Sequence, residues 1–268
     1  MIRIKNLSIS YDHNLVIKDL TLNVNEGEWA LITGPSGSGK STLARSISGL
    51  IPHAVQAEVS GSIQVNGRNT LVSTLPEISQ QVGMVFQNPG AQLFHLSVEE
   101  ELAFGPRNLG LSESEVQDRI SRVLIDVGIE NLRKKRPDKL SGGQKQLVAV
   151  AAVLTMEPRV LVLDEPTASL DVSSLSCLME VLSRLKTQKG ITIIMVEHRL
   201  HAVQYGVDKF YVMDEGQIVH QGPAVEILED PVCRKAYGLR RPVEQKMASW
   251  KKLININGAM DQNVPPLL

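Results

Sequence analysis

Cysteine is scarce in this sequence, with only Cys177 and Cys233 among 268 residues. Two scattered thiols do not make a disulfide framework, and they lack the spacing of zinc ligands. The composition therefore predicts a protein of a reducing compartment. A chain of this length can bury enough apolar surface to fold without either kind of cross-link.

Long apolar runs are also missing. None approaches the ~20 residues that a membrane-spanning helix needs. Residues 1–5 alternate apolar and polar side chains, which indicates a strand rather than a secretion signal. Any role at a membrane is therefore expected to depend on a partner protein.

The sequence has no excess of charge of one sign. Lys and Arg total 28 against 29 Asp and Glu, which leaves a net charge of -1. A general nucleic-acid binder is usually basic, so the balance argues against that class. Hydrophobic residues at 43% and charged residues at 21% are ordinary for a soluble globular protein.

What is present is an alternation of strand and helix patterns, interrupted in the middle. Strands are predicted at residues 2–11, 16–24, 29–33, 62–65, 160–163, 191–196, 209–213 and 217–220. Helices are predicted from Ser41 toward Leu50, over residues 173–189, and briefly from Pro223. Residues 87–140 instead show helical signals, including a Ser112–Glu115 capping box. The pattern predicts an α/β fold with a helical insertion.

A glycine-rich loop follows the strand at residues 29–33. It fits G-x-x-x-x-G-K-[ST] through Gly34, Pro35, Ser36, Gly37, Ser38, Gly39, Lys40 and Ser41, with Thr42 next. Glycines let backbone N–H groups converge on phosphate oxygens, and the next helix directs its positive dipole end there. Lys40 is expected to reach the β- and γ-phosphates of ATP, and Ser41 to ligate Mg²⁺. The plainer alternative is a turn with a solvated lysine.

Two acids, Asp164 and Glu165, end the apolar strand at residues 160–163. The carboxyl ends of buried parallel strands face the crevice in which α/β sheets bind ligands. Asp164 is expected to hold Mg²⁺, and Glu165 to polarise the attacking water. Alternatively, the acids only cap a helix.

The motif Leu140-Ser141-Gly142-Gly143-Gln144 resembles the signature of ABC ATPases, and most other phosphate-loop proteins lack it. The resemblance runs from about Ile2 to Tyr237. It implies a P-loop NTPase of ABC type, with a mixed central sheet, an antiparallel β subdomain and a helical subdomain at roughly 88–140. The expected domain covers residues 1–238, and residues 239–268 form a C-terminal tail. Through Ser141 and the glycine amides, the signature would bind the γ-phosphate of a nucleotide held by another subunit.

The same resemblance implies roles for single residues. Tyr11 would stack on adenine, although a core position is the alternative. Gln87 would touch Mg²⁺ and the lytic water. Asp171 would lie in the loop that crosses the dimer interface, and His198 would contact the γ-phosphate.

Two basic features receive plainer interpretations. His198 and His201 have no third ligand nearby, so a metal pair is not expected. The run at residues 133–136 is interpreted as a solvated loop before the signature.

Residues 86–94 and 98–106 are similar to the energy-coupling-factor and cobalt-importer ATPases. In those proteins a short helix ending in Gln-Leu-Phe helps to shape the groove for a coupling helix of the transmembrane subunit. Gly90 and Ala91 depart from that branch, which usually has acids there, and Leu147 stands where it usually has Arg.

The resemblance implies an ATPase, with ATP and Mg²⁺, that powers vitamin or metal-ion uptake at the cytoplasmic face of a membrane. The implied partners are a second ABC ATPase subunit, identical or different, a transmembrane coupling subunit and a substrate-capture membrane subunit, without nucleic acid. The alternatives are a soluble non-transport ABC ATPase of translation or DNA repair, a phosphate-loop small-molecule kinase, and a subunit that only binds nucleotide.

Overall fold

A computed structural model describes residues 1–198, 205–224 and 226. The strands in chain order are β1 (Ile2–Tyr11), β2 (Asn14–Val24), β3 (Trp29–Thr33), β4 (Glu58–Val65), β5 (Arg68–Asn69), β6 (Val82–Val85), β7 (Val160–Asp164), β8 (Thr192–Val196), β9 (Lys209–Asp214) and β10 (Gln217–Pro223). The helices are α1 (Lys40–Ile47), α2 (Leu50–His53), α3 (Leu75–Ser79), α4 (Pro89–Gln92), α5 (Val98–Asn108), α6 (Glu113–Val127), α7 (Gly142–Leu154) and α8 (Val172–Lys189), with 3₁₀ turns η1 (Glu130–Leu132) and η2 (Pro137–Lys139).

The strands form two sheets. The larger has the order β10-β9-β3-β8-β7-β6, in which only the β10–β9 pair is antiparallel. The smaller has the order β2-β1-β4-β5 and is wholly antiparallel. The predicted fold class, a mixed central sheet with an antiparallel β subdomain and a helical insertion, is confirmed.

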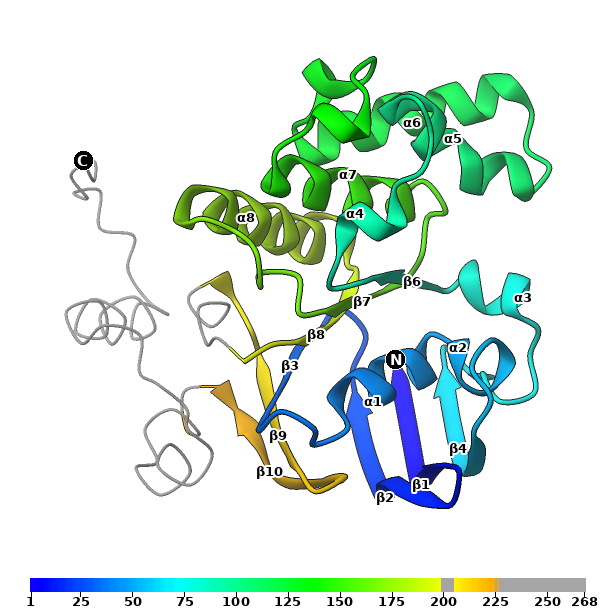
Figure 1. The fold of residues 1–268 in the computed structure, drawn as a ribbon, viewed down its shortest axis with the longest axis vertical. Helices are drawn as coiled ribbons and strands as arrows, with labels where there is room; N and C mark the ends of the chain where they lie inside the picture. The colour runs from blue at the N-terminus through cyan, green and yellow to red at the C-terminus, as the bar shows by residue number, and fades with distance from the viewer. Residues whose placement is uncertain (199–204, 225, 227–268) are drawn as a thin grey trace.

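The large sheet is buried on both faces, which explains the continuous apolar runs of its central strands. In β3, Trp29 and Leu31 point into a core shared with α5 to α8, whereas Ala30 and Ile32 point into a core shared with α1 and the antiparallel sheet. Figure 1 shows this layering, with α5 to α8 on one side of the large sheet and α1 beside β1, β2 and β4 on the other.

Several predicted bounds need correction. The helix expected to reach Leu50 ends at Ile47, because Gly49 takes a left-handed conformation with φ of 75° and starts the separate α2. The strand expected at residues 62–65 begins at Glu58. Pro223 is the last residue of β10, and the described residues directly beyond it, Ala224 and Glu226, are helical; the rest of the helix predicted there lies outside the described residues.

The strand β6 was not predicted at all. It is a four-residue run that contains Gly83, and its pairing with β7 supplies what local propensity lacks. Gly83 is needed there because a Cβ would lie 2.0 Å from Cγ1 of Val153 on α7. Tertiary contact therefore selects the residue and creates the strand.

The helical insertion begins directly after Gln87. Residues 89–139 hold α4, α5, α6, η1 and η2. The short helix expected to end in Gln-Leu-Phe is present as α4 despite Gly90 and Ala91, but it ends at Gln92, before Leu93 and Phe94. The Ser112–Glu115 capping box starts α6, as predicted. The exact domain bounds stay a prediction, and the tail at 239–268 lies outside the described residues.

Arg133 does not behave as part of a solvated loop, so that interpretation was wrong for this residue. Its guanidinium donates to Oε1 of Glu99 at 3.0 and 2.7 Å, to Oγ of Ser121 at 3.1 Å and to Oε1 of Gln117 at 2.6 Å. The side chain joins α5 and α6 to the segment that leads to the signature motif. The other residues of that run, 134–136, are exposed.

Candidate functional site

The phosphate loop (residues 34–41) connects the end of β3 to α1, as the sequence predicts. Its conformation requires glycine at Gly34, where φ is 141° and a Cβ would lie 1.9 Å from the carbonyl oxygen of Met213. Gly39 has φ of 98° and directly precedes the first residue of α1. The first amides of α1 therefore face the loop that precedes the helix.

Lys40 is buried, with only 4% of its surface exposed. Its ammonium donates to the carbonyl oxygens of Gly34 at 3.0 Å and Pro35 at 2.6 Å, and to Oγ of Ser38 at 3.3 Å. Burial lowers the pKa of Lys40, and the charges of Glu165 and Asp164 oppose this shift. A phosphate anion would stabilise the desolvated ammonium, so the site suits one.

Ser41 and Asp164 meet across 123 positions of sequence, with Oγ donating to Oδ1 at 2.9 Å. Asp164 is 4% exposed, and burial raises the pKa of its carboxyl, opposed by the hydrogen bond from Ser41. Hard oxygen ligands beside a phosphate loop are the set that Mg²⁺ prefers. The donor set therefore fits Mg²⁺ bound together with nucleotide.

Glu165 lies between two other predicted site residues. Its Oε2 accepts from Nε2 of Gln87 at 2.8 Å, and its Oε1 lies 3.0 Å from Nε2 of His198. The backbone of Glu165 has φ of 47°, a strained value for a residue with a Cβ. Such backbone strain concentrates at functional sites. In this conformation the backbone N–H of Glu165 donates to the carbonyl oxygen of Val196 on β8.

The phosphate loop, Glu165 and His198 border a hollow of about 290 Å³, whereas Gln87 and Asp164 are not part of its lining. Its lining consists of Val16, Ser36, Gly37, Gly39, Lys40, Ser41, Thr42, Glu165 and His198. The sequence analysis missed Val16, because nothing in a strand pattern marks a residue that faces a ligand.

Other predicted residues lie outside this hollow. Ser141 is the N-cap of α7, and Gln144 completes its capping box. Gly143 packs against Ser174, where a Cβ would approach Oγ to 2.2 Å. Asp171 caps α8 by accepting from the amide of Ser174 at 2.7 Å, and this bond lowers the pKa of its carboxyl.

Tyr11 also lies away from the hollow's lining and packs, half-buried, against the core of the antiparallel sheet. Its stacking on adenine stays a prediction.

A buried acid, Glu197, was not singled out from the sequence. It accepts from the amide of Thr167 at 2.9 Å and from the Thr167 hydroxyl, so it holds the loop after Glu165 against the end of β8. Its position directly before His198 at a strand end was the only available signal.

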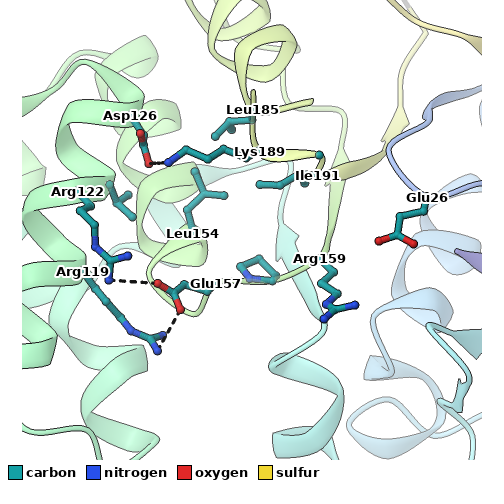
Figure 2. Close-up of a pocket in the computed structure, with 13 residues that line it drawn as sticks. Glu26, Arg119, Arg122, Asp126, Leu154, Glu157, Arg159, Leu185, Lys189 and Ile191 are labelled. Carbon is teal, nitrogen blue, oxygen red and sulfur yellow. Dashed lines mark ion pairs between the residues drawn. The ribbon is translucent and has the colours of Figure 1, made fainter. Parts of the chain in front are cut away.

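A second hollow, of about 410 Å³, lies among α6, the end of α7 and the end of α8 (Figure 2). Figure 2 shows Arg119 and Arg122 directed at Glu157, with N–O distances of 3.1 and 3.3 Å, and Lys189 directed at Asp126 at 3.0 Å. None of the predicted site residues lines it. These paired charges connect α6 to the segment after α7 and to the end of α8.

Among the described residues no three His, Cys, Asp or Glu side chains gather as a metal site, and His201 lies outside the described part. The same residues include no helix that is long and apolar enough to cross a membrane.

Comparison with known proteins covers most of the chain. A family model described as "ABC transporter" matches residues 17–168. A Pyrococcus abyssi protein named provisionally as an ABC transporter ATP-binding protein is 40% identical, over 92% of this chain and 89% of that protein. A similarly named protein of Methanosarcina mazei is also 40% identical over 90% of this chain, which spans only 40% of that longer protein.

Solved structures agree with the fold. CbiO1 from Clostridium perfringens, described as part of the ABC transporter complex CbiONQ, is 35% identical with a TM-score of 0.79, covering 95% of this chain and 98% of that one. An ATP-binding cassette solved as a dimer in a post-hydrolysis state with ADP and Pi is 28% identical with a TM-score of 0.70, covering 83% of this chain and 98% of that one.

Proposed function

The chain belongs to the ABC transporter ATP-binding family, and from this premise we propose that it powers an importer of the energy-coupling-factor type, for a vitamin or a metal ion. As a cassette of this family it binds ATP with Mg²⁺ and hydrolyses ATP. The likeness to CbiO1 of a CbiONQ complex supports the importer type. The observation that carries the proposal is a group of exposed apolar side chains on α5 and on the segment around α4, which follows Gln87 of the nucleotide site.

For hydrolysis, we assign Glu165 to the attacking water, because its carboxylate lies between Gln87 and His198 at the edge of the phosphate hollow. Lys40 and the loop amides would stabilise charge on the β- and γ-phosphates, and His198 would contact the γ-phosphate. Ser41, Asp164 and Gln87 would hold Mg²⁺, which neutralises phosphate charge when bound.

The signature motif (residues 140–144) lies outside the hollow that its own phosphate loop lines. Cassettes of this family dimerise. We infer that Ser141, Gly142, Gly143 and Gln144 complete the nucleotide site of a partner cassette, with Asp171 at the interface. The partner is a second copy of this chain or a different ABC subunit.

The exposed surface carries Phe86, Phe94, Leu96 and Phe104, which are 36%, 66%, 70% and 45% exposed. A hollow of about 310 Å³ runs beside Phe94 and Leu96 to Arg136 and Lys145. Phe94 packs on Phe104 and shares the hollow with Leu96, and exposed apolar side chains that gather in this way mark an interaction site. We assign it to a coupling helix of a transmembrane subunit, which places the chain at the cytoplasmic face of the membrane as a peripheral subunit.

The test is affinity purification of the tagged full chain from native membranes in detergent, with identification of the co-purifying proteins. Recovery of a transmembrane protein, a second cassette or copy, and a small substrate-capture protein is expected. Recovery of a purely soluble complex, such as ribosomes, would overturn the transport proposal in favour of the non-transport alternative while leaving the ATPase chemistry intact.

A further inference from the structure

Glu101 is a buried acid outside the nucleotide site. It lies on α5 and is 6% exposed. Its Oε2 atom accepts from the amides of Phe94 and His95, both at 2.9 Å, and lies 3.1 Å from Nδ1 of His95. A buried carboxylate is costly unless it is hydrogen-bonded, and these amides are the donors that offset its burial.

One of the bonded residues, Phe94, carries an exposed ring of the proposed docking surface, and the other, His95, lies against that ring. Phe94 and Phe104 meet edge to face with centroids 5.3 Å apart, and the His95 ring lies 4.3 Å from Phe94 and 5.1 Å from Phe104. We refer to Phe94, His95 and Phe104 as the aromatic cap. All three rings contact one another, and Phe94 and Phe104 remain exposed to solvent.

The backbone below the cap lacks regular structure. Residues 93–97 connect α4 to α5 and belong to neither helix. The amide of Leu93 still donates to the carbonyl of Pro89 in the last turn of α4, whereas the next two amides donate to Glu101. The carboxylate therefore supplies the hydrogen bonds that a continued helix would have supplied.

Glu101 stands on a firmly held element. Ser97 caps the start of α5 by accepting from the amide of Glu100 at 3.2 Å. Two residues before Glu101, Glu99 pairs with Arg133, which also binds α6. The acceptor is thus fixed relative to the helical insertion before any partner arrives.

We propose that Glu101 is a positioning residue that preforms the aromatic cap for the membrane subunit, an inference that rests on the proposed function. Without the Glu101 carboxylate, residues 93–97 would become ordered only when the partner docks. The conformational entropy lost in that ordering would weaken the affinity for the partner. Glu101 is not among the residues that line the phosphate hollow, so its effect is expected on partner recognition rather than on ATP binding.

The test compares Glu101→Met, which keeps the volume and removes the acceptor, with Glu101→Gln, which keeps an acceptor oxygen. Hydrogen exchange is measured on the full chain, and the integral membrane protein recovered by affinity purification is quantified. In the Met variant, exchange at the Phe94 and His95 amides should rise about ten-fold or more and recovery should fall about ten-fold, because both hydrogen bonds are lost. The Gln variant should stay within about two-fold of wild type. Unchanged ATP affinity in both variants confirms that the fold is intact.

Faster exchange with undiminished recovery in the Met variant would overturn the proposal, as would unchanged exchange. If the Met variant fails to fold, Phe104→Ala tests the role of the aromatic cap instead. This variant removes one ring from the cap and leaves the Glu101 contacts in place. It should lower recovery without changing exchange, and normal recovery would overturn the role of the cap. A wild-type chain that recovers no membrane protein would instead refute the proposed transport function itself.

Discussion

Nε2 of Gln87 lies 2.8 Å from Oε2 of Glu165, although 78 positions separate them in the sequence. Gln87 directly precedes α4, and Glu165 follows β7. If a docked partner displaced α4, the Gln87 side chain would therefore move too. Gln87 donates a hydrogen bond to Glu165, the acid that we assign to the attacking water. This contact offers a short physical route from the exposed apolar surface to the phosphate hollow.

Glu165→Gln should keep ATP binding and lose turnover. The amide cannot accept a proton from water, so phosphate release should fall by roughly 10²–10⁴-fold while the Kd for ATP changes little. Glu130→Gln, on an exposed acid of η1, is the matched control. Normal turnover of the Glu165 variant would sink this assignment.

Lys40→Ala should weaken nucleotide binding. Charge-assisted hydrogen bonds to phosphate contribute about 1.5–3 kcal/mol, which corresponds to roughly 10–100-fold in Kd. Equilibrium titration with a fluorescent ATP analogue measures this, and Lys5→Ala on an exposed position of β1 serves as the control. Equal affinity in wild type and the Lys40 variant would contradict the loop assignment.

Apparent Mg²⁺ affinity in the presence of ATP should fall as pH decreases. Burial raises the pKa of Asp164 above the ordinary 3.8, so its carboxyl takes up a proton at a higher pH than a solvated Asp does. The protonated form is a poor metal ligand, and the proton and Mg²⁺ compete for it. Asp164→Asn should bind Mg²⁺ weakly and should lack this part of the pH dependence. An identical pH profile in the two proteins would argue against Asp164 as a ligand.

Gly143→Ala should destabilise the fold and Gly142→Ala should not. A Cβ at position 143 would lie 2.2 Å from Oγ of Ser174, whereas at position 142 its nearest neighbour, the carbonyl oxygen of Ser169, is 3.8 Å away. Forced overpacking costs about 1–3 kcal/mol in the free energy of unfolding, measurable by urea titration. Ser174→Gly should rescue the Gly143 variant, and failure of that rescue would show that the contact is not the cause.

Glu157→Gln should cost little stability despite its two arginine partners. The Glu157 side chain is 48% exposed, and exposed ion pairs contribute about 0–1 kcal/mol each. The loss should shrink in high salt, because ions screen the pairs. A double-mutant cycle with Arg119→Ala tests this; a coupling that salt leaves unchanged would show that the Glu157–Arg119 interaction is not a screened surface pair.

Prediction from sequence succeeded where a local pattern carries the physics. The phosphate loop needs glycines and a following helix, and the capping box at Ser112 needs two residues three apart. It failed for β6, whose four residues become a strand only through β7, and for Arg133, whose partners lie on α5 and α6. A basic run in the sequence does not show whether an arginine side chain is solvated or, like Arg133, joins two helices.

The sequence by itself determined the fold class and the nucleotide chemistry, and it predicted the residues that we assign to that chemistry, because each motif is a short stretch of backbone with its own geometry. Only the tertiary structure decided that Gln87 and His198 converge on Glu165, and that Ser41 meets Asp164. It also decided that Glu101 binds the backbone beneath the aromatic cap. Contacts between segments far apart in the chain depend on how the sheet and helices pack. That packing is a cooperative property of the whole core, which no local window of sequence contains.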